Sequence, residues 1–208
     1  MTETEICNMA LGRIGAKRIS DFADTNEDNH QSVQCRLHYV QTRDALLRSH
    51  WWRFARYRVQ LSENTTAPTF EFDNAFDLPS DFLRLWIRPF EDNNWGLNNT
   101  DRTFSMEGKQ LLTNEDSVYL RYIRRVTDPA EFDPLFIEVL VLKLAIKMVM
   151  PISQDKELYQ ILYQEMRDVL ARVRVVDKRE TNNVGVSDRG RWNDARIVGG
   201  GDPARSYD

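Results

Sequence analysis

The chain has 208 residues and a formal net charge of −4, from 28 lysines and arginines against 32 aspartates and glutamates. Hydrophobic residues account for 41% and charged residues for 29%, a globular composition that excludes wholly disordered and fibrous classes. The slightly acidic balance gives no general attraction to nucleic acid or to acidic membranes, so any such contact has to be local.

The first fifty residues predict two helices. Residues 1–5 are polar and acidic, unlike a secretory signal, so we expect synthesis in a cytoplasm. Thr2 and Glu5 have the spacing of a capping box, and a short helix follows until Gly15. The polar segment 24–28 precedes a second periodic run that ends among basic residues. The apolar residues that set the period of this second run are Val33, Leu37, Val40 and Leu47.

The cysteines and histidines of these helices indicate no metal or redox site. Cys7 and Cys35 are too few and too far apart for a disulfide framework or a CxxC motif, and we expect two reduced, buried thiols. The spacings of His30, His38 and His50 match neither a helical zinc pair nor a zinc finger. We therefore expect no metal ligands.

From residue 51 the pattern changes to short, β-prone runs. Aromatic and branched residues crowd positions 51–59, and turn-forming residues follow. Gly108, after Glu107, predicts the tip of a hairpin, because glycine takes the positive φ that such a turn requires. Further strands are predicted at residues 70–76, 82–87, 103–106, 109–112 and 118–126.

Two long helices are predicted after the strands. Asp133 and Pro134 are an N-cap and a first-turn proline, and the helix is expected to end at Met150, before Pro151. It is apolar nearly all round but shorter than the roughly 20 residues of a membrane span. We expect it to be the central helix of a bundle, partly covered by neighbouring subunits. After Ser153 an amphipathic helix is expected, with Leu158, Leu162, Glu165, Val169, Val173 and Val176 at helical spacing.

The order of these elements predicts an α+β fold. Residues 1–50 and 129–180 would form a helical bundle, and residues 51–128 an inserted small antiparallel β domain. Residues 181–208 would be an extended C-terminal tail. This tail has no hydrophobic period and only isolated apolar residues, so it cannot bury itself alone and is suited to ordering on a partner.

No catalytic constellation is recognisable. The chain has neither a phosphate-binding GxxxxGK[ST] nor a dinucleotide-binding GxGxxG between a strand and a helix. The segment 185–190 is one residue too long for a nucleophile elbow. We expect a protein that is not an enzyme, with no catalytic, metal-binding or cofactor-binding residues and no cofactor.

Arginines and aromatic rings alternate in residues 48–58, as they do on surfaces that bind single-stranded nucleic acid. The alternative function is therefore a nucleic-acid-binding module in which Arg53, Arg56 and Arg58 contact the ligand. Rings at a junction between a helix and a strand more commonly pack in the core, with arginine stems over them. Because the net charge is negative, core packing is the favoured interpretation.

Five segments, in chain order, resemble one family. They are RDALLRSHWWRFA at 43–55, DLPSDFLRL at 77–85, LRYI at 120–123, DPAEFDPLF at 128–136 and RWNDAR at 191–196. Together they look like the tail tubular protein A type of head-to-tail adaptor from short-tailed bacteriophages and prophages. None of the segments carries chemistry, and it is their ordered set that makes the resemblance.

The resemblance implies a structural protein of the virion neck. Its subunits would form a ring, typically of twelve copies, between the portal protein and a tail nozzle protein of the tail tubular protein B type. Genomic DNA would pass through the channel without sequence-specific binding, and no membrane is involved. The helices would form the ring body, and the β insertion would face the nozzle or a neighbour. The tail would dock on the portal or on a neighbouring subunit through Arg189, Arg191, Trp192, Arg196 and Ile197.

Overall fold

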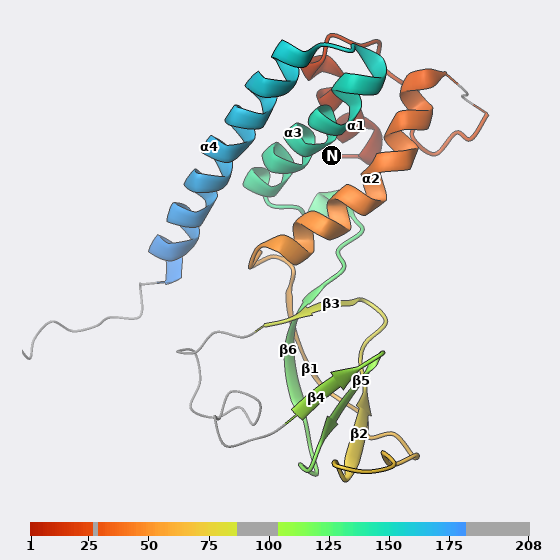
Figure 1. The fold of residues 1–208 in the computed structure, drawn as a ribbon, viewed down its shortest axis with the longest axis vertical. Coiled ribbons are helices and arrows are strands. Elements are labelled where there is room, and N and C mark those ends of the chain that lie inside the picture. The colour runs from red at the N-terminus through yellow and green to blue at the C-terminus, as the bar shows by residue number, and fades with distance from the viewer. Residues whose placement is uncertain (27–28, 87–103, 182–208) are drawn as a thin grey trace, which may run out of the picture. The chain divides into compact units, whose positions relative to one another are not determined.

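The computed structural model describes residues 1–26, 29–86 and 104–181, which fold into four α-helices and two three-stranded antiparallel sheets (Figure 1). This confirms the predicted α+β class. The chain divides into two compact units, Met1–Val169 and Leu170–Asp208, and both the helical part and the sheets belong to the first. The boundaries of a separate β domain at residues 51 and 128 stay a prediction.

Helix α1, Glu3–Arg13, begins as predicted. The Thr2 hydroxyl accepts a hydrogen bond from the Glu5 amide at 3.2 Å, and the Glu5 carboxylate accepts one from the Thr2 amide at 2.8 Å, so the capping box is present. The helix ends where Gly15 adopts a φ of 67°, a left-handed conformation that glycine takes without strain. Its buried side chains are Ile6, Cys7, Ala10 and Leu11.

Helix α2, His30–Ser49, is rotated from the orientation that its apolar period indicates. Val33, Leu37 and Val40 point outward and are 40%, 56% and 46% exposed. The prediction of the packed face was therefore wrong for these three residues and right only for Leu47. The buried side chains are instead Ser32, Cys35, Tyr39, Thr42, Arg43, Leu46 and Leu47.

The polar residues on the buried face of α2 explain why this orientation is tolerated. The Ser32 hydroxyl donates to the Asn29 carbonyl at 3.0 Å, so its polar atom is satisfied within the helix. Arg43 pairs with the neighbouring Asp44 at 2.9 Å, and its guanidinium lies 6.0 Å from the centroid of the Tyr39 ring. Since both faces of α2 carry apolar residues, periodicity alone could not identify the packed one.

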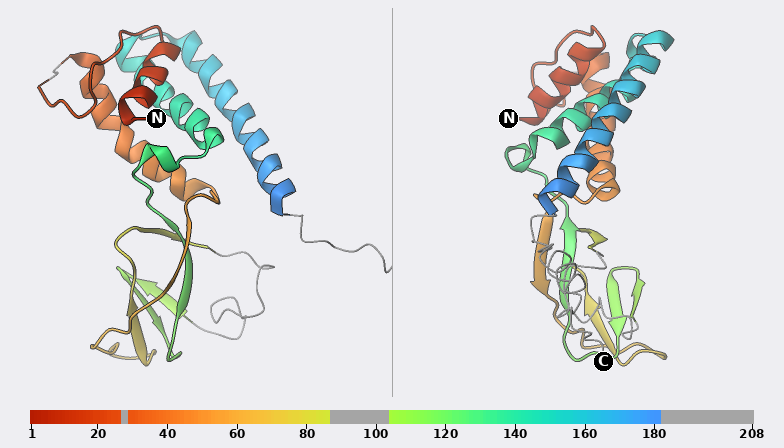
Figure 2. Two further views of the ribbon diagram at one scale, coloured as in Figure 1. Left: turned by 180° about the vertical axis from the view of Figure 1, so that it is seen from behind. Right: turned by 90° about the vertical axis from the view of Figure 1, so that its left-hand side faces the viewer.

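Helix α3, Pro134–Ile152, packs against both α1 and α2 (Figures 1 and 2). Asp133 caps it by accepting from the Leu135 amide at 2.8 Å, as predicted. The helix extends past Pro151 because the amides of Ser153 and Gln154 both donate to the Val149 carbonyl and close the last turn. Nine of its side chains are buried: Phe136, Val139, Leu140, Val141, Leu142, Leu144, Ala145, Met148 and Val149.

The chain itself covers α3 at those nine positions, while Met150 of the same helix is 39% exposed. The expectation that neighbouring subunits cover part of α3 stays a prediction. Apolar side chains also stay exposed on α2.

Helix α4, Lys156–Thr181, is amphipathic as predicted. Leu162, Val169 and Val173 are buried, but Val176 is 40% exposed, which corrects its assignment to the packed face. Glu165 sits beside this face and forms an ion pair with Arg13 of α1 at 2.9 Å, which explains an acid among the periodic positions.

The strands form two sheets, with the orders β1-β6-β3 and β2-β5-β4. Their bounds are β1 Arg56–Gln60, β2 Asn74–Asp77, β3 Phe82–Leu85, β4 Phe104–Glu107, β5 Gln110–Thr113 and β6 Tyr119–Arg124. The two sheets share a core made of Leu61, Phe76, Leu111, Val118, Leu120 and Tyr122. Gly108 and Lys109 form the two-residue loop between β4 and β5, and Gly108 has the predicted positive φ, 60°.

Two predicted strands begin later than expected. A turn at residues 52–55, in which the Ala55 amide donates to the Trp52 carbonyl, delays β1 to Arg56. Residues 70–73 precede β2 as a bend, and the Phe70 side chain is 78% exposed. A short 3₁₀ helix, η2, Pro129–Glu131, connects the sheets back to α3.

Candidate interaction surfaces

Trp52, in the middle of the arginine and aromatic cluster, is a core residue. It is only 4% exposed, and its indole N–H donates to the Leu46 carbonyl at 2.9 Å. Its ring also meets the Phe136 ring edge-on, with centroids 5.0 Å apart. The interpretation of this ring as core packing is therefore confirmed, and the face of Trp52 is not offered to a ligand.

Arginines and tryptophans around Trp51 form an alternating stack. The Arg84 guanidinium lies 3.9 Å from the centroid of the Trp51 ring, which meets Trp86 edge-on at 4.9 Å. The Arg56 guanidinium in turn lies 5.1 Å from the Trp86 centroid. Such cation–π contacts favour the observed positions of these rings and guanidinium groups relative to one another.

The end of α2 is tied to β3 by two reciprocal hydrogen bonds. Arg48 donates to the Leu83 carbonyl at 2.7 Å, and Arg84 donates to the Arg48 carbonyl at 3.1 Å. Nearby, Arg125 pairs with Asp44 of α2 at 2.9 Å, and Arg124 forms an ion pair with Glu131 of η2. The cluster that resembles a nucleic-acid surface is thus largely the joint between the helices and the first sheet.

Of the three arginines named for nucleic-acid contact, Arg53 and Arg58 are exposed and Arg56 is half-buried on Trp86. The register pairs Arg58 with Arg121 and places Arg56 and Arg58 on the same face of β1. Arg84 of β3 pairs with Ile123, the residue opposite Arg56, and so belongs to this face too. The sequence indicated Arg56 and Arg58, and also Arg121 as a residue of the same sheet, but only the strand register reveals that Arg84 joins them.

The predicted docking residues of the C-terminal tail, Arg189, Arg191, Trp192, Arg196 and Ile197, lie outside the described residues. Their assignment to a partner stays a prediction.

The outward face of α2 carries an apolar stripe, which we call the α2 stripe and define as Val33, Leu37 and Val40. The spacings of four and three residues place the three side chains on one side of the helix. Arg36 lies beside the stripe, and Asp44, four residues after Val40, lies on the same side of the helix. The α2 stripe is therefore an exposed aliphatic surface with charges of both signs beside it.

One side of α4 also exposes an aliphatic side chain, and we call it the α4 flank, defined as Glu157, Ile161 and Asp168. Ile161 is 62% exposed, and the two carboxylates on the same side of the helix are exposed as well. Gln164 donates to Asp168 at 3.0 Å within this flank. Arg172, four residues after Asp168, is exposed on the same side of the helix, so charges of both signs accompany this single exposed aliphatic side chain.

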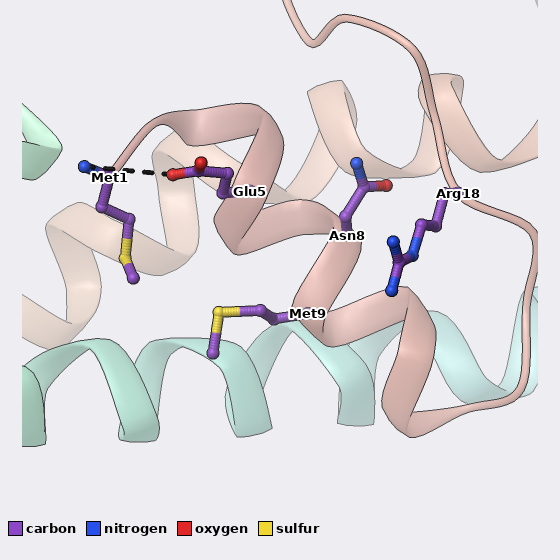
Figure 3. Close-up of a pocket in the computed structure, with 5 residues that line it drawn as sticks. All are labelled: Met1, Glu5, Asn8, Met9 and Arg18. Atoms are coloured by element: carbon purple, nitrogen blue, oxygen red, sulfur yellow. Dashed lines mark ion pairs between the residues drawn. The ribbon is translucent and has the colours of Figure 1, made fainter.

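A groove of about 500 Å³ lies along α1, lined by Met1, Glu5, Asn8, Met9 and Arg18 (Figure 3). Two of its polar side chains, Glu5 and Asn8, already have partners. Glu5 serves the capping box and lies 3.9 Å from the amino group of Met1, while the Asn8 amide bonds both the amide and the carbonyl of Ile19. Asn8 therefore fastens the loop after α1 to the helix.

The buried titratable groups lie at the contact between α1 and α2. Cys7 and Cys35 are free and fully buried, as predicted. A hydrogen bond with Cys35, together with burial, raises the pKa of the Cys7 thiol far above its ordinary value. Burial and the nearby Glu3 carboxylate raise the pKa of the Tyr39 phenol. Each group is held neutral at physiological pH, which fits packing and not nucleophilic chemistry.

Among the helices that the structure describes, none has the length and apolar character required to cross a membrane. In the same described segments, no three His, Cys, Asp or Glu side chains are grouped closely enough to hold a metal ion. Comparison with known proteins gives no match: neither a protein-family model nor a curated protein matches this chain.

Proposed function

We propose that the chain is a structural subunit of a ring-forming head-to-tail adaptor in a short-tailed bacteriophage. It joins the portal to the tail nozzle, surrounds the channel through which the DNA passes, and catalyses no reaction. The observation that carries this proposal is the α2 stripe. A helix that buries polar residues and leaves three aliphatic side chains outside is typical of a surface that meets another protein.

The resembling segments give a second line of support, because four of them lie together in the fold. Segment 43–55 forms the end of α2 and the turn into β1, and segment 77–85 contains β3, which Arg48 and Arg84 tie to α2. Segment 120–123 lies in β6 between β1 and β3, and segment 128–136 leads through η2 into α3. The resemblance thus concerns one connected structural joint and not scattered similarities.

Native mass spectrometry and negative-stain imaging of the purified full chain test the proposal, alone and mixed with portal rings of a short-tailed phage. We expect closed rings of a single stoichiometry that bind coaxially to the portal. A chain that stays monomeric in both conditions would contradict the adaptor function.

Removal of residues 182–208 tests the docking role of the tail separately. We expect the truncated chain to fold with an unchanged far-UV spectrum and to lose binding to the portal. Portal binding equal to that of the full chain would refute the role of Arg191 and Trp192.

A second candidate function, nucleic-acid binding, is favoured by one observation. Arg56, Arg58, Arg84 and Arg121 share one face of the first sheet. If this face binds single strands, retention on them should fall steeply with salt and should weaken when Arg58, which is exposed on this face, is changed to alanine. Unchanged retention in that variant would remove this candidate.

A further inference from the structure

The side of α3 that faces away from α1 gathers positive charge between α2 and α4 (Figure 1). It exposes Lys147 and carries the half-buried Lys143 one turn earlier. His38 of α2 lies beside them, since Cys35, one turn before it, contacts Met148 of α3 at 3.8 Å. Burial and the Lys147 ammonium lower the pKa values of both Lys143 and His38, so the three groups are close enough to repel one another. We call these three residues the basic face.

The acids of the surrounding helices lie on other sides. Glu138, nine residues before Lys147, is on the opposite side of α3, and Asp44 is on the side of the α2 stripe. On α4, Glu165 pairs with an arginine of α1, and the other acids before residue 169 belong to the α4 flank. Asp155, just before α4, caps that helix. Among the described residues of these helices, the basic face therefore has no carboxylate on its own side.

Aromatic rings border the basic face on α4. Glu165 and Tyr159 flank the buried Leu162 on its two sides, and because Glu165 faces α1, Tyr159 faces the open side of α3. The Tyr159 and Tyr163 rings stack with their centroids 6.3 Å apart, and Tyr163 is 43% exposed. Lysines beside exposed rings favour a partner surface that combines negative charge with an aromatic side chain.

The same chain has such a surface at the end of the sheets away from the helices (Figure 1). Residues 62–73 and 114–116 meet there, because the Asp73 amide donates to the Asn114 side chain at 2.9 Å, and we call these two segments the Phe70 tip. Phe70 is 78% exposed. No lysine or arginine occurs at positions 59–83 or 110–120. The acids of the tip are Glu63, Glu71, Asp73, Glu115 and Asp116, of which only Glu115 is half-buried.

The backbone of the tip holds Phe70 outward. Glu71 has a φ of 74°, a left-handed conformation that is strained for a residue other than glycine and persists only where surrounding contacts hold it. The Phe72 amide donates to the Phe70 carbonyl at 3.0 Å, and the Asn64 amide donates to the Ala75 carbonyl at 2.7 Å. A ring presented on a fixed loop loses less conformational entropy on binding than a ring on a freely moving one.

We propose that the Phe70 tip of one copy docks on the basic face of a second copy, with the Phe70 ring against those of Tyr159 and Tyr163. The inference rests on the proposed assembly of copies and adds a contact beside the one made by the α2 stripe. Because the two surfaces differ, the contact is head-to-tail: each copy offers its tip to one neighbour and its basic face to the other. Repetition of such a contact closes into a ring when the rotation between copies divides a full turn.

Charge reversal and its rescue test the pairing. Glu71→Lys and Lys147→Glu should each weaken self-association about tenfold, measured by sedimentation velocity, because each places like charges across the contact. The chain with both substitutions restores opposite charges and should regain most of the lost affinity. A double variant that associates more weakly than either single variant would contradict the pairing.

Glu107→Lys is the matched control for Glu71→Lys. It makes the same change of charge at an exposed position of β4, at the end of the hairpin away from the tip. It should leave self-association unchanged and should not rescue Lys147→Glu. Rescue by Glu107→Lys equal to that by Glu71→Lys would show that net charge, and not this contact, sets the affinity.

Disulfide cross-linking tests the contact without removing its charges or its ring. Thr69→Cys lies beside Phe70, and Met150→Cys lies one turn after Lys147, while the natural Cys7 and Cys35 are buried. We expect a covalent dimer when the two variants are mixed and oxidised, and little dimer from either alone. Met106→Cys, at a position that is 39% exposed, should give none with Met150→Cys. A dimer formed equally well by Thr69→Cys alone would overturn the inference in favour of a contact between two tips.

The outcomes separate this inference from the proposed function. Rings of the unsubstituted chain without a cross-link between residues 69 and 150 would overturn the pairing and leave the adaptor function standing. An unsubstituted chain that is monomeric at every concentration, with no cross-link in the mixture, would also overturn the pairing, and the experiment with portal rings would then decide the adaptor function alone.

Discussion

Helices α3 and α2 use their apolar residues in opposite ways. α3 is apolar nearly all round, yet its own chain buries nine of its side chains. α2 is more polar in sequence but leaves Val33, Leu37 and Val40 exposed and buries Ser32, Thr42 and Arg43. The difference teaches that the hydropathy of a helix does not indicate which surface needs a partner. What matters is whether the rest of the fold covers the side of the helix on which the apolar residues lie.

The largest expected effect concerns α3. Phe136 is fully buried and its ring contacts those of Trp52, Phe54 and Phe132. Phe136→Ala should lower the free energy of unfolding by about 3–5 kcal/mol, because it removes buried apolar surface and leaves a cavity. Urea unfolding followed by circular dichroism measures the loss. A loss below about 1 kcal/mol would mean that α3 is not the covered helix of this comparison.

A smaller effect is expected at the joint between the helices and the first sheet. Trp52→Phe removes the bond from the indole N–H to the Leu46 carbonyl and part of a buried ring, so we expect a loss of about 1–3 kcal/mol. Trp51→Phe is the matched control, since Trp51 is only half-buried and should cost less. The same unfolding measurement compares the two, and a greater cost at Trp51 would contradict the assignment of Trp52 to the core.

Alkaline pH probes the buried face of α2. The pKa values of Cys7 and Tyr39 are raised in the folded state, while in the unfolded chain these groups ionise at their ordinary values of 9.0 and 10.0. Above those values the unfolded state binds fewer protons than the folded state, so stability is present at lower pH and falls as the pH rises. Each group contributes a slope of about 1.4 kcal/mol per pH unit once it is ionised in the unfolded chain.

Unfolding midpoints at pH 8 and pH 10.5 measure this loss. Tyr39→Phe retains the ring but has no ionisable phenol, so it should reduce the loss of stability between those two values and leave the part that comes from Cys7. Stability that stays constant over this interval in the natural chain would show that the Cys7 and Tyr39 groups are not held neutral by the fold.

The smallest expected effect on stability is on the outward face of α2. Leu37→Ser should change the free energy of unfolding by no more than about 0.5 kcal/mol, since the side chain is 56% exposed in the single chain. The same variant should assemble less well, because the interface loses apolar surface. A loss of several kcal/mol in the monomer would show that Leu37 belongs to the core.

The sequence predicted the elements of the fold better than their orientation. Capping at Thr2 and Asp133 and the turn at Gly108 depend on neighbouring residues alone, and all three are present. The packed face of α2 depends on α1 and α3, which lie elsewhere in the sequence. For this helix the apolar period therefore predicted the wrong face. Local patterns therefore determine where helices begin, whereas tertiary contacts decide which side of α2 is covered.

The candidate surfaces were predictable only in part. The alternation of arginine and tryptophan at 48–58 was visible, but its role as a joint depends on Arg84 and Leu83, which come thirty residues later. The α2 stripe could not be recognised because the apolar period of α2 predicts that the same residues form the packed face.

The central claim is that this chain assembles through the outward face of α2, and native mass spectrometry of the natural chain beside Leu37→Glu tests it most directly. We predict closed rings for the natural chain and monomers for Leu37→Glu at the same concentration, with the same far-UV circular dichroism spectrum for both chains. Rings of unchanged stoichiometry and abundance in Leu37→Glu would contradict the claim.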